Sequence, residues 1–193
     1  MNGLKALSAI GALALATSAF AAGARTDQVV DRDVNQQERV EHGLQDGQLD
    51  TKEAGQIERD EARIDRTEAH DLKDGKLSPE EQARINRMQN KTSAEIYRDA
   101  HNSATANPES KSSERMQADV ARNVRQEQRI DQGVDSGSLT NREVGSLEAG
   151  QANVDHKEAA AARNGHVSAG EEARVQRSED HQGRRIHRKK TNG

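Results

Sequence analysis

The chain has no cysteine and no tryptophan, and its 193 residues include only two prolines, one tyrosine and one phenylalanine. The absence of cysteine excludes disulfide bonds, a thiolate zinc site and a lipid anchor on a cysteine side chain. Hydrophobic residues make up 31% of the chain and charged residues 32%, with a mean hydropathy of −1.08. A conventional close-packed core is therefore not expected, and disorder is one interpretation of this composition.

Two features favour a folded helical chain over disorder. Acidic and basic residues nearly cancel, leaving a formal net charge of −4, and the apolar residues recur at helical spacing. Neither half of the chain is basic enough to predict nucleic-acid binding. No nucleophile stands beside a base in a catalytic motif, and no glycine-rich phosphate loop follows a strand pattern. We therefore predict that the protein is not an enzyme and carries no cofactor.

The first 24 residues differ from the rest of the chain. Met1 to Lys5 form a short basic start, and Ala6 to Ala16 form an apolar run before several small residues. This order is typical of a secretory signal peptide, here cleaved near Ala21 or Ala24, and the run is too short to span a membrane. We predict a periplasmic or secreted protein, with a buried N-terminal helix as the alternative for this segment.

Residues 30–102 recur at 120–192, where 24 of 73 aligned positions are identical without a gap. Such an internal repeat indicates a tandem duplication. A position kept in both copies serves the shared fold, and a position kept in one copy cannot belong to a site that both share. Gly55 and Gly145 are kept inside a predicted helix, where glycine costs about 1 kcal/mol. We therefore predict a close helix approach or a kink at both places.

Four short strings recur at equivalent places in the two copies. Each has a glycine, then Leu or Val two residues later, then a helix-capping residue followed by Glu at the third position after it. Glycine adopts the left-handed backbone that ends a helix, and the cap and the Glu satisfy the first backbone N–H groups of the next helix. The predicted caps are Asp50, Ser78, Thr140 and Ser168.

Between these turns the apolar residues form narrow stripes at helical spacing, which predict an all-α fold. Short turns between long helices favour antiparallel neighbours, so each copy is predicted to be an antiparallel three-helix unit. The sequence leaves open how the two units dock. The predicted helices cover about 28–45, 50–73, 78–100, 113–135, 140–163 and 168–189. The predicted domains are a signal peptide (1–24), a first repeat (25–102), a linker (103–113) and a second repeat with a basic tail (114–193).

Oppositely charged residues that both copies keep are predicted to pair across the turns. If the chain reverses at each turn, acidic positions of the second helix face arginines of the first or third helix. Such pairs would fix the register of the helices more than they stabilise the fold. Their interpretation as catalytic acids and bases is the alternative. The predicted pairs are Arg39 with Glu58, Asp65 with Arg87, Glu68 with Arg84, Arg129 with Glu148, Asp155 with Arg177 and Glu158 with Arg174.

The turn strings resemble the second half of an EF-hand calcium loop. When Gly47 is aligned with the invariant glycine of that loop, neighbouring carboxylates fall at its later positions. The first half departs from the pattern, since His42 and Leu44 stand where calcium needs oxygen ligands. We interpret the strings as capped turns and keep a weak divalent-cation site as the alternative. Its candidate ligands are Asp46, Asp50, Glu53, Asp74 and Glu81.

The positions that differ between the copies are the candidates for a partner. None of the seven histidines recurs at the offset of 90, so no shared histidine site is predicted. The basic tail from Arg184 to Lys190 is also unique to the second copy and favours an anionic surface as a contact. Our leading hypothesis is a non-enzymatic exported helical-repeat protein that acts as a scaffold, stress or interaction protein through an unknown protein partner or as a homo-oligomer. The alternative is a periplasmic divalent-cation-binding protein.

Overall fold

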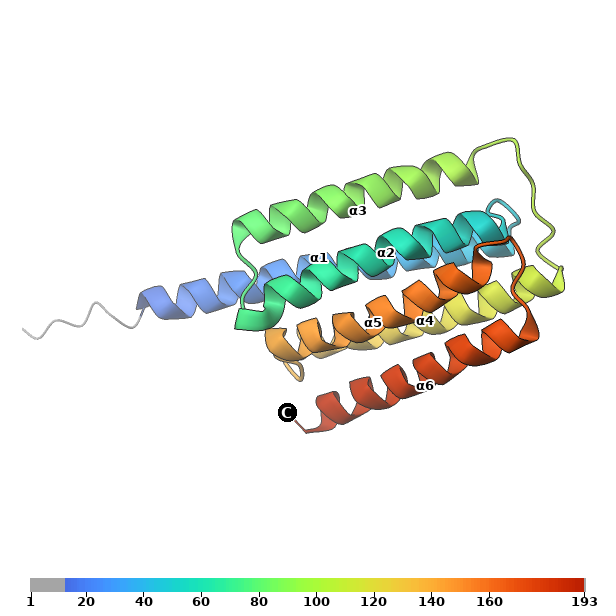
Figure 1. The fold of residues 1–193 in the computed structure, drawn as a ribbon. Coiled ribbons are helices and arrows are strands. Elements are labelled where there is room, and N and C mark those ends of the chain that lie inside the picture. Colours follow the sequence, from blue (N-terminus) through green and yellow to red (C-terminus); the bar gives the residue numbers. More distant parts are fainter. Residues whose placement is uncertain (1–12, 193) are drawn as a thin grey trace, which may run out of the picture.

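The computed structural model describes the backbone of residues 13–192 and the side chains of residues 23–192. This part of the chain contains helices and no strand, which confirms the all-α part of the predicted fold class. The helices match the six predicted ranges, except that the first begins well before residue 28. They are α1 (Leu13–Gln45), α2 (Thr51–Asp71), a short 3-10 helix η1 (Leu72–Asp74), α3 (Pro79–Ala100), α4 (Lys111–Asp135), α5 (Asn141–Ala162) and α6 (Ala169–Thr191) (Figure 1).

The predicted signal peptide lies partly outside the described residues, because nothing is described before residue 13. Helix α1 runs without a break through both predicted cleavage positions, Ala21 and Ala24. The packed part of this helix begins just beyond them, at the buried side chains of Thr26, Val29 and Val30. Cleavage at either position would therefore leave the packed part of α1 in the mature chain.

The turn chemistry predicted from the four strings is confirmed. The glycines at 47, 75, 137 and 165 all have positive φ angles, between 68° and 86°. Each of the four predicted caps accepts a hydrogen bond from the backbone N–H three residues later, and the Glu at that position accepts one from the N–H of the cap. Both ends of each turn are thus satisfied by residues that lie within a single string of sequence.

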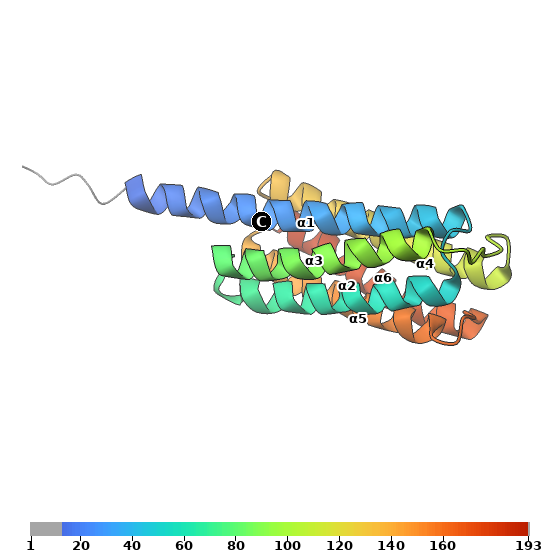
Figure 2. The same ribbon diagram turned by 90° about the horizontal axis from the view of Figure 1, so that it is seen from above.

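The two copies share one core. The most extensive helix contacts are those between α2 and α5 and between α1 and α4, and each joins one copy to the other. Both pairs run antiparallel, while α3 covers α1 and α2 on one side and α6 covers α4 and α5 on the other (Figures 1 and 2). The result is a central four-helix arrangement flanked by two outer helices. Each copy therefore relies on the other to cover its second helix.

The retained glycines of the second helices explain how α2 and α5 come so close. A Cβ atom at Gly55 would collide with the Cβ of Ala162, and one at Gly145 would lie 2.8 Å from the Cβ of Leu72. The two contacts are equivalent, because each residue of the second contact stands 90 positions from one of the first. The predicted close approach is confirmed, and α2 and α5 meet in a pseudo-twofold manner.

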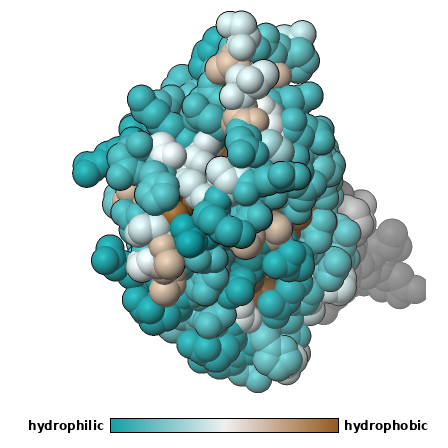
Figure 3. Space-filling view, turned by 90° about the vertical axis from the view of Figure 1, so that its right-hand side faces the viewer, coloured by the Kyte–Doolittle hydropathy of each residue, from teal (hydrophilic) through white to brown (hydrophobic). Residues whose placement is uncertain are grey.

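Apolar side chains are concentrated at the two ends of the central bundle. One cluster gathers where α1 ends and α4 begins, and includes Leu44, Ile57 and Met116. The other gathers where α1 begins to pack and α4 ends, and includes Ile64, Ile130 and Leu147. The surface in Figure 3 is mostly hydrophilic, and Tyr97 is the large hydrophobic side chain that stands exposed among the described residues. No helix within the described residues is long and apolar enough to cross a membrane.

Candidate functional site: a carboxyl cluster in the core

Acidic side chains fill the middle of the bundle, between the two apolar ends. Nine carboxyl groups there have an exposed fraction of 4% or less. They come from the four central helices and from both copies. We refer to them as the central carboxyl cluster: Asp33 of α1; Glu58, Glu61, Asp65 and Glu68 of α2; Glu127 of α4; and Glu148, Asp155 and Glu158 of α5.

Six members of this cluster were expected to form ion pairs with arginine, and the structure places them elsewhere. Arg84 contacts Asp71 instead of Glu68. Arg39 donates to the backbone oxygen of Ser93 at 3.1 Å, and Arg129 donates to that of Gly183 at 3.4 Å. The other three arginines, Arg87, Arg174 and Arg177, are exposed. None of the ion pairs found among residues 23–192 includes a member of the cluster.

The expectation failed because it considered only the helices of one hairpin. Each turn does reverse the chain, but the face of α2 that carries Glu58, Asp65 and Glu68 is directed into the bundle, where α5 packs. Asp71 lies close to one helical turn beyond Glu68, and it is Asp71 that meets Arg84 of α3. The Glu and Asp positions kept in both copies are therefore core positions and do not face the arginines.

The candidate ligands in the turns are used as helix caps. Asp50 Oδ1 accepts from the N–H groups of Lys52 and Glu53, both at 2.7 Å, and Glu53 Oε2 accepts from the N–H of Asp50 at 2.9 Å. Glu81 and Asp74 likewise accept from backbone N–H groups of their own turn, while Asp46 is exposed. None of these five carboxylates belongs to a group of ligand atoms close enough to share an ion, within the described residues. The structure thus gives the EF-hand resemblance no support.

Two groups of three carboxylates in the cluster do bring their oxygens together. The first group consists of Glu58, Asp155 and Glu158, and the second consists of Asp65, Glu127 and Glu148. In each group, one oxygen from every residue lies within 4.8 Å of the others. Oxygens on opposite sides of a calcium ion are about 4.6–5.2 Å apart, and those around magnesium about 4.0–4.2 Å. Three oxygens gathered within this limit are close enough to contact a single calcium or magnesium ion.

Several oxygens of the cluster have no donor from the protein. Both side-chain oxygens of Glu68, Glu148 and Glu158 are buried without a hydrogen-bond partner in the part of the chain that the structure describes. Buried polar atoms are almost always hydrogen-bonded, and leaving one unsatisfied costs about 1–3 kcal/mol, more for charged groups. Protons shared between the acids, bound cations or buried water can satisfy these oxygens.

Burial is the main cause of raised pKa values throughout the cluster. Loss of water raises the pKa of Asp155 to about 6, that of Asp33 to about 7 and that of Glu58 to about 8. Hydrogen bonds from Asn123 to Asp155 and from Gln37 to Glu58 oppose these shifts. The pKa values of the remaining six members lie well above the usual range, again through burial first and repulsion between carboxylates second.

The magnitude of the repulsion shows that the cluster cannot be fully ionised without a counter-charge. Two carboxylates separated by 4.8 Å repel by about 3.5 kcal/mol at an effective dielectric constant of about 20. Three such pairs in one group would cost about 10 kcal/mol, which is comparable with the whole stability of a typical domain. At neutral pH the cluster must therefore hold protons or cations.

Neutral amides surround the carboxylates where arginine or lysine would otherwise be expected. Gln37 donates to Glu58 Oε2 at 3.0 Å, and Asn123 donates to Asp155 Oδ1 at 2.7 Å. Gln89 of α3 reaches Asp33 Oδ1 at 2.7 Å. These contacts orient individual oxygens without cancelling their charge. Hydrogen bonds that orient ligating carboxylates in this way are typical of metal centres.

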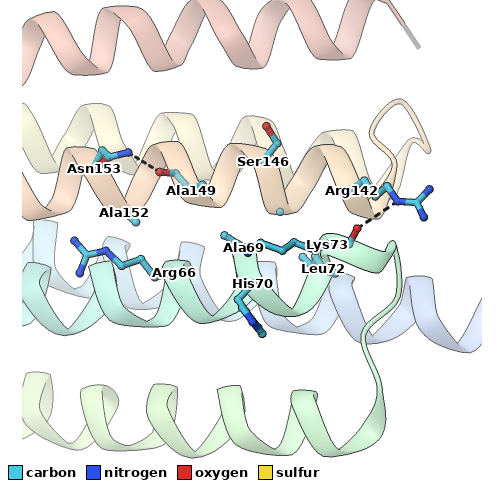
Figure 4. A pocket seen from close by; sticks show the side chains of 11 residues that line it. Arg66, Ala69, His70, Leu72, Lys73, Arg142, Ser146, Ala149, Ala152 and Asn153 are labelled. Atoms are coloured by element: carbon cyan, nitrogen blue, oxygen red, sulfur yellow. Dashed lines mark hydrogen bonds between the residues drawn. The ribbon is translucent and has the colours of Figure 1, made fainter.

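A surface groove between α2 and α5 is a separate feature (Figure 4). It has a volume of about 610 Å³ and a floor of small residues such as Ala149 and Ala152. Arg66, His70 and Arg142 stand at its edge, and no carboxylate lines it. Its basic rim does not suit a cation, so we do not assign the site to this groove.

Sequence reasoning missed the cluster although a signal was present. Glu58, Glu61, Asp65 and Glu68 are spaced by three, four and three residues, which is the spacing of a helix seam. Three of these four acids recur in the second copy. Acids that recur in both copies and lie on one face of a helix indicate that this face forms a polar core. Acids that form surface ion pairs with arginine need not lie on the same face.

The comparisons with known proteins leave the geometry as the basis for function. No protein-family model, no curated protein and no solved structure matches the chain.

Proposed function

We propose that this protein is a non-enzymatic, exported helical-repeat protein that binds hard divalent cations in its central carboxyl cluster. The observation that carries the proposal is the set of buried oxygens on Glu68, Glu148 and Glu158 that have no donor. Cations would satisfy these oxygens and remove the repulsion between the carboxylates in one step. The proposed cation site lies in the central carboxyl cluster and not in the turns, where the sequence had predicted it.

The donor set favours calcium and manganese over softer metals. Every candidate ligand in the cluster is a carboxylate or amide oxygen, and the groups include no histidine. Oxygen-only sites suit Ca²⁺, Mg²⁺ and Mn²⁺, whereas zinc and copper prefer nitrogen and sulfur ligands.

The test is calorimetric titration of the metal-free protein at pH 7.5 with Ca²⁺, Mn²⁺ and Mg²⁺. We expect stoichiometric binding with release of protons, because the ligands must lose their protons to coordinate the ion. Glu148→Gln should weaken binding strongly. Asp46→Asn changes an exposed carboxylate of a turn and serves as the matched control that leaves binding unchanged.

The alternative, a scaffold that uses only its surface, gives the opposite result. Its acidic core would then be held together by shared protons, and none of the three ions would bind in the titration. If Asp46→Asn abolished binding and Glu148→Gln did not, the site would lie in the turns and the core proposal would be overturned.

A second candidate function is contact with an anionic membrane surface through α4 and α6. A surface hollow of about 780 Å³ there is lined by Arg122 and Arg129 among other basic residues. Three of its lining residues replace uncharged ones of the first copy: Arg125 for Asn35, Arg184 for Ala94 and His187 for Tyr97. Cosedimentation with phosphatidylglycerol vesicles should be lost in Arg125→Asn/Arg184→Ala. Equal binding to phosphatidylcholine vesicles would contradict a charge-based contact.

A further inference from the structure

The two carboxylate groups are related by the internal repeat. Glu58 of the first group corresponds to Glu148 of the second, and Asp155 corresponds to Asp65, each at an offset of 90. The antiparallel contact of α2 with α5 has the same symmetry. Exchanging the two copies turns the contact of Gly55 with Ala162 into the contact of Gly145 with Leu72. The cluster is therefore two versions of one arrangement, placed on either side of a pseudo-twofold axis.

Each group draws its carboxylates from both copies. Glu58 belongs to the first copy, and its partners Asp155 and Glu158 belong to the second. In the other group, Asp65 belongs to the first copy, and Glu127 and Glu148 belong to the second. An ion held by either group would therefore join the two copies and would need their docked arrangement in order to bind.

The two groups differ in charge at one equivalent position. Glu127 of the second group corresponds to Gln37, which lies beside Glu58 of the first group. The Oε1 atom of Gln37 is buried without a partner, so it offers a neutral oxygen where Glu127 offers a charged one. At this position the second group thus has a charged ligand where the first group has a neutral one.

We infer that the core holds two cations per chain, one in each group, and that the two ions bind with unequal affinity. This inference rests on the proposed cation-binding function and extends it to the number and position of the ions. The unpartnered oxygens support one ion on each side, because Glu158 belongs to the first group and Glu148 to the second. Affinity for hard cations changes with the charge of the ligands, so the difference between Gln37 and Glu127 should give the two groups different affinities.

The two sites are close enough to influence one another. Asp65 and Asp155 belong to different groups and are counterparts in the internal repeat, and they lie close enough for their charges to interact. An ion in one group therefore acts on the ligands of the other. Because the groups also differ at Gln37 and Glu127, two steps of unequal affinity are expected in place of two identical independent sites.

The experiment is a titration of the full chain with Mn²⁺ at pH 7.5, followed by electron paramagnetic resonance and calorimetry. The resonance of free Mn²⁺ reports how many ions are bound, and a second bound ion broadens the signal of the first. We expect two ions per chain, bound in two steps. Glu127→Gln should weaken the step at its own group by about tenfold or more, and Gln37→Glu should strengthen the step at the other group by a similar factor.

The two substitutions are a matched pair, since each converts one copy's residue into the residue of the other copy. Circular dichroism of both variants at pH 5 with chelator checks that they fold, because protons satisfy the core under that condition. A single bound ion, or the same effect of Glu127→Gln on both steps, would overturn the two-site inference and leave cation binding intact. Absence of any bound ion would overturn the proposed function itself.

Discussion

The middle of the core and its two ends are built from the same helices by opposite means. At the ends, side chains such as Leu44 and Ile130 are fully buried and give stability through loss of contact with water. In the middle, the buried side chains are acids that repel one another and carry unsatisfied oxygens. The ends stabilise the closed bundle, whereas the middle needs protons or cations to offset the repulsion between its acids. This division is typical of proteins in which a stable frame positions a strained site.

The largest effect should come from separating the copies. We predict that residues 103–193 alone lose most of their helical signal in far-ultraviolet circular dichroism, because α4 and α5 would lose the partners that cover them at both the apolar ends and the acidic middle. Adding a fragment of residues 25–102 should restore it. A separate fragment that melts cooperatively would show that each copy has a sufficient core of its own.

The next effect sharpens the contrast by changing pH. The acids of the middle have raised pKa values, so the folded state binds more protons than the unfolded chain, and stability falls as pH rises. With chelator present, we predict that the free energy of unfolding falls by several kcal/mol between about pH 4 and about pH 8, where Asp155, Asp33 and Glu58 lose their protons. Urea unfolding at several pH values measures this change.

Excess Ca²⁺ or Mn²⁺ should remove this fall or reverse it, since cations take the place of the lost protons. A stability curve that is flat with pH in chelator would mean that the acids are not buried in the folded protein.

A pair of single substitutions compares the two regions directly. Ile130→Ala at an apolar end should lower the free energy of unfolding by about 2–5 kcal/mol in any buffer, because it leaves a cavity. Glu148→Gln in the middle should raise stability or leave it unchanged in chelator at pH 8, because it removes one buried charge. With saturating Ca²⁺, the Glu148→Gln variant should be less stable than the unmodified protein. Equal losses for Glu148→Gln in both buffers would count against cation binding at this carboxylate.

The smallest effect concerns a pair outside both regions. The structure joins Arg84 to Asp71 and not to Glu68. A double-mutant cycle with Arg84→Ala and Asp71→Asn should give a coupling of about 1 kcal/mol or less, because the arginine is half exposed. The corresponding cycle with Glu68→Gln should give no coupling. A larger coupling with Glu68 would restore the cross-turn pairing expected from the sequence.

Features that depend only on neighbouring residues were predicted correctly from the sequence. The left-handed glycines and the capping boxes at Asp50, Ser78, Thr140 and Ser168 need only residues within one turn, and all four are present as expected. The spacing of Gly55 and Gly145 also predicted a close helix contact correctly. It did not show that the contact joins the two copies, because nothing in either copy by itself identifies the helix that lies opposite.

The partners of the retained acids could not be derived in the same way. From the sequence, the carboxylate of Glu68 or Asp155 could form an ion pair with an arginine across its own turn. Such a pair is excluded only because the helix face that carries these acids is buried. Burial in turn depends on the docking of α2 on α5, which is a contact between residues about 90 positions apart in the chain.

Six helices, their turns and an internal repeat could be derived from the sequence, since hydrogen bonds and apolar spacing along a short stretch of chain specify them. The docking of α2 on α5, and with it the meeting of nine acids in the core, became visible only in the folded chain. A charged side chain has no fixed partner until another helix covers the face on which it lies. The same Glu and Asp side chains would form surface ion pairs in two separate bundles, and they form a buried carboxyl cluster in one.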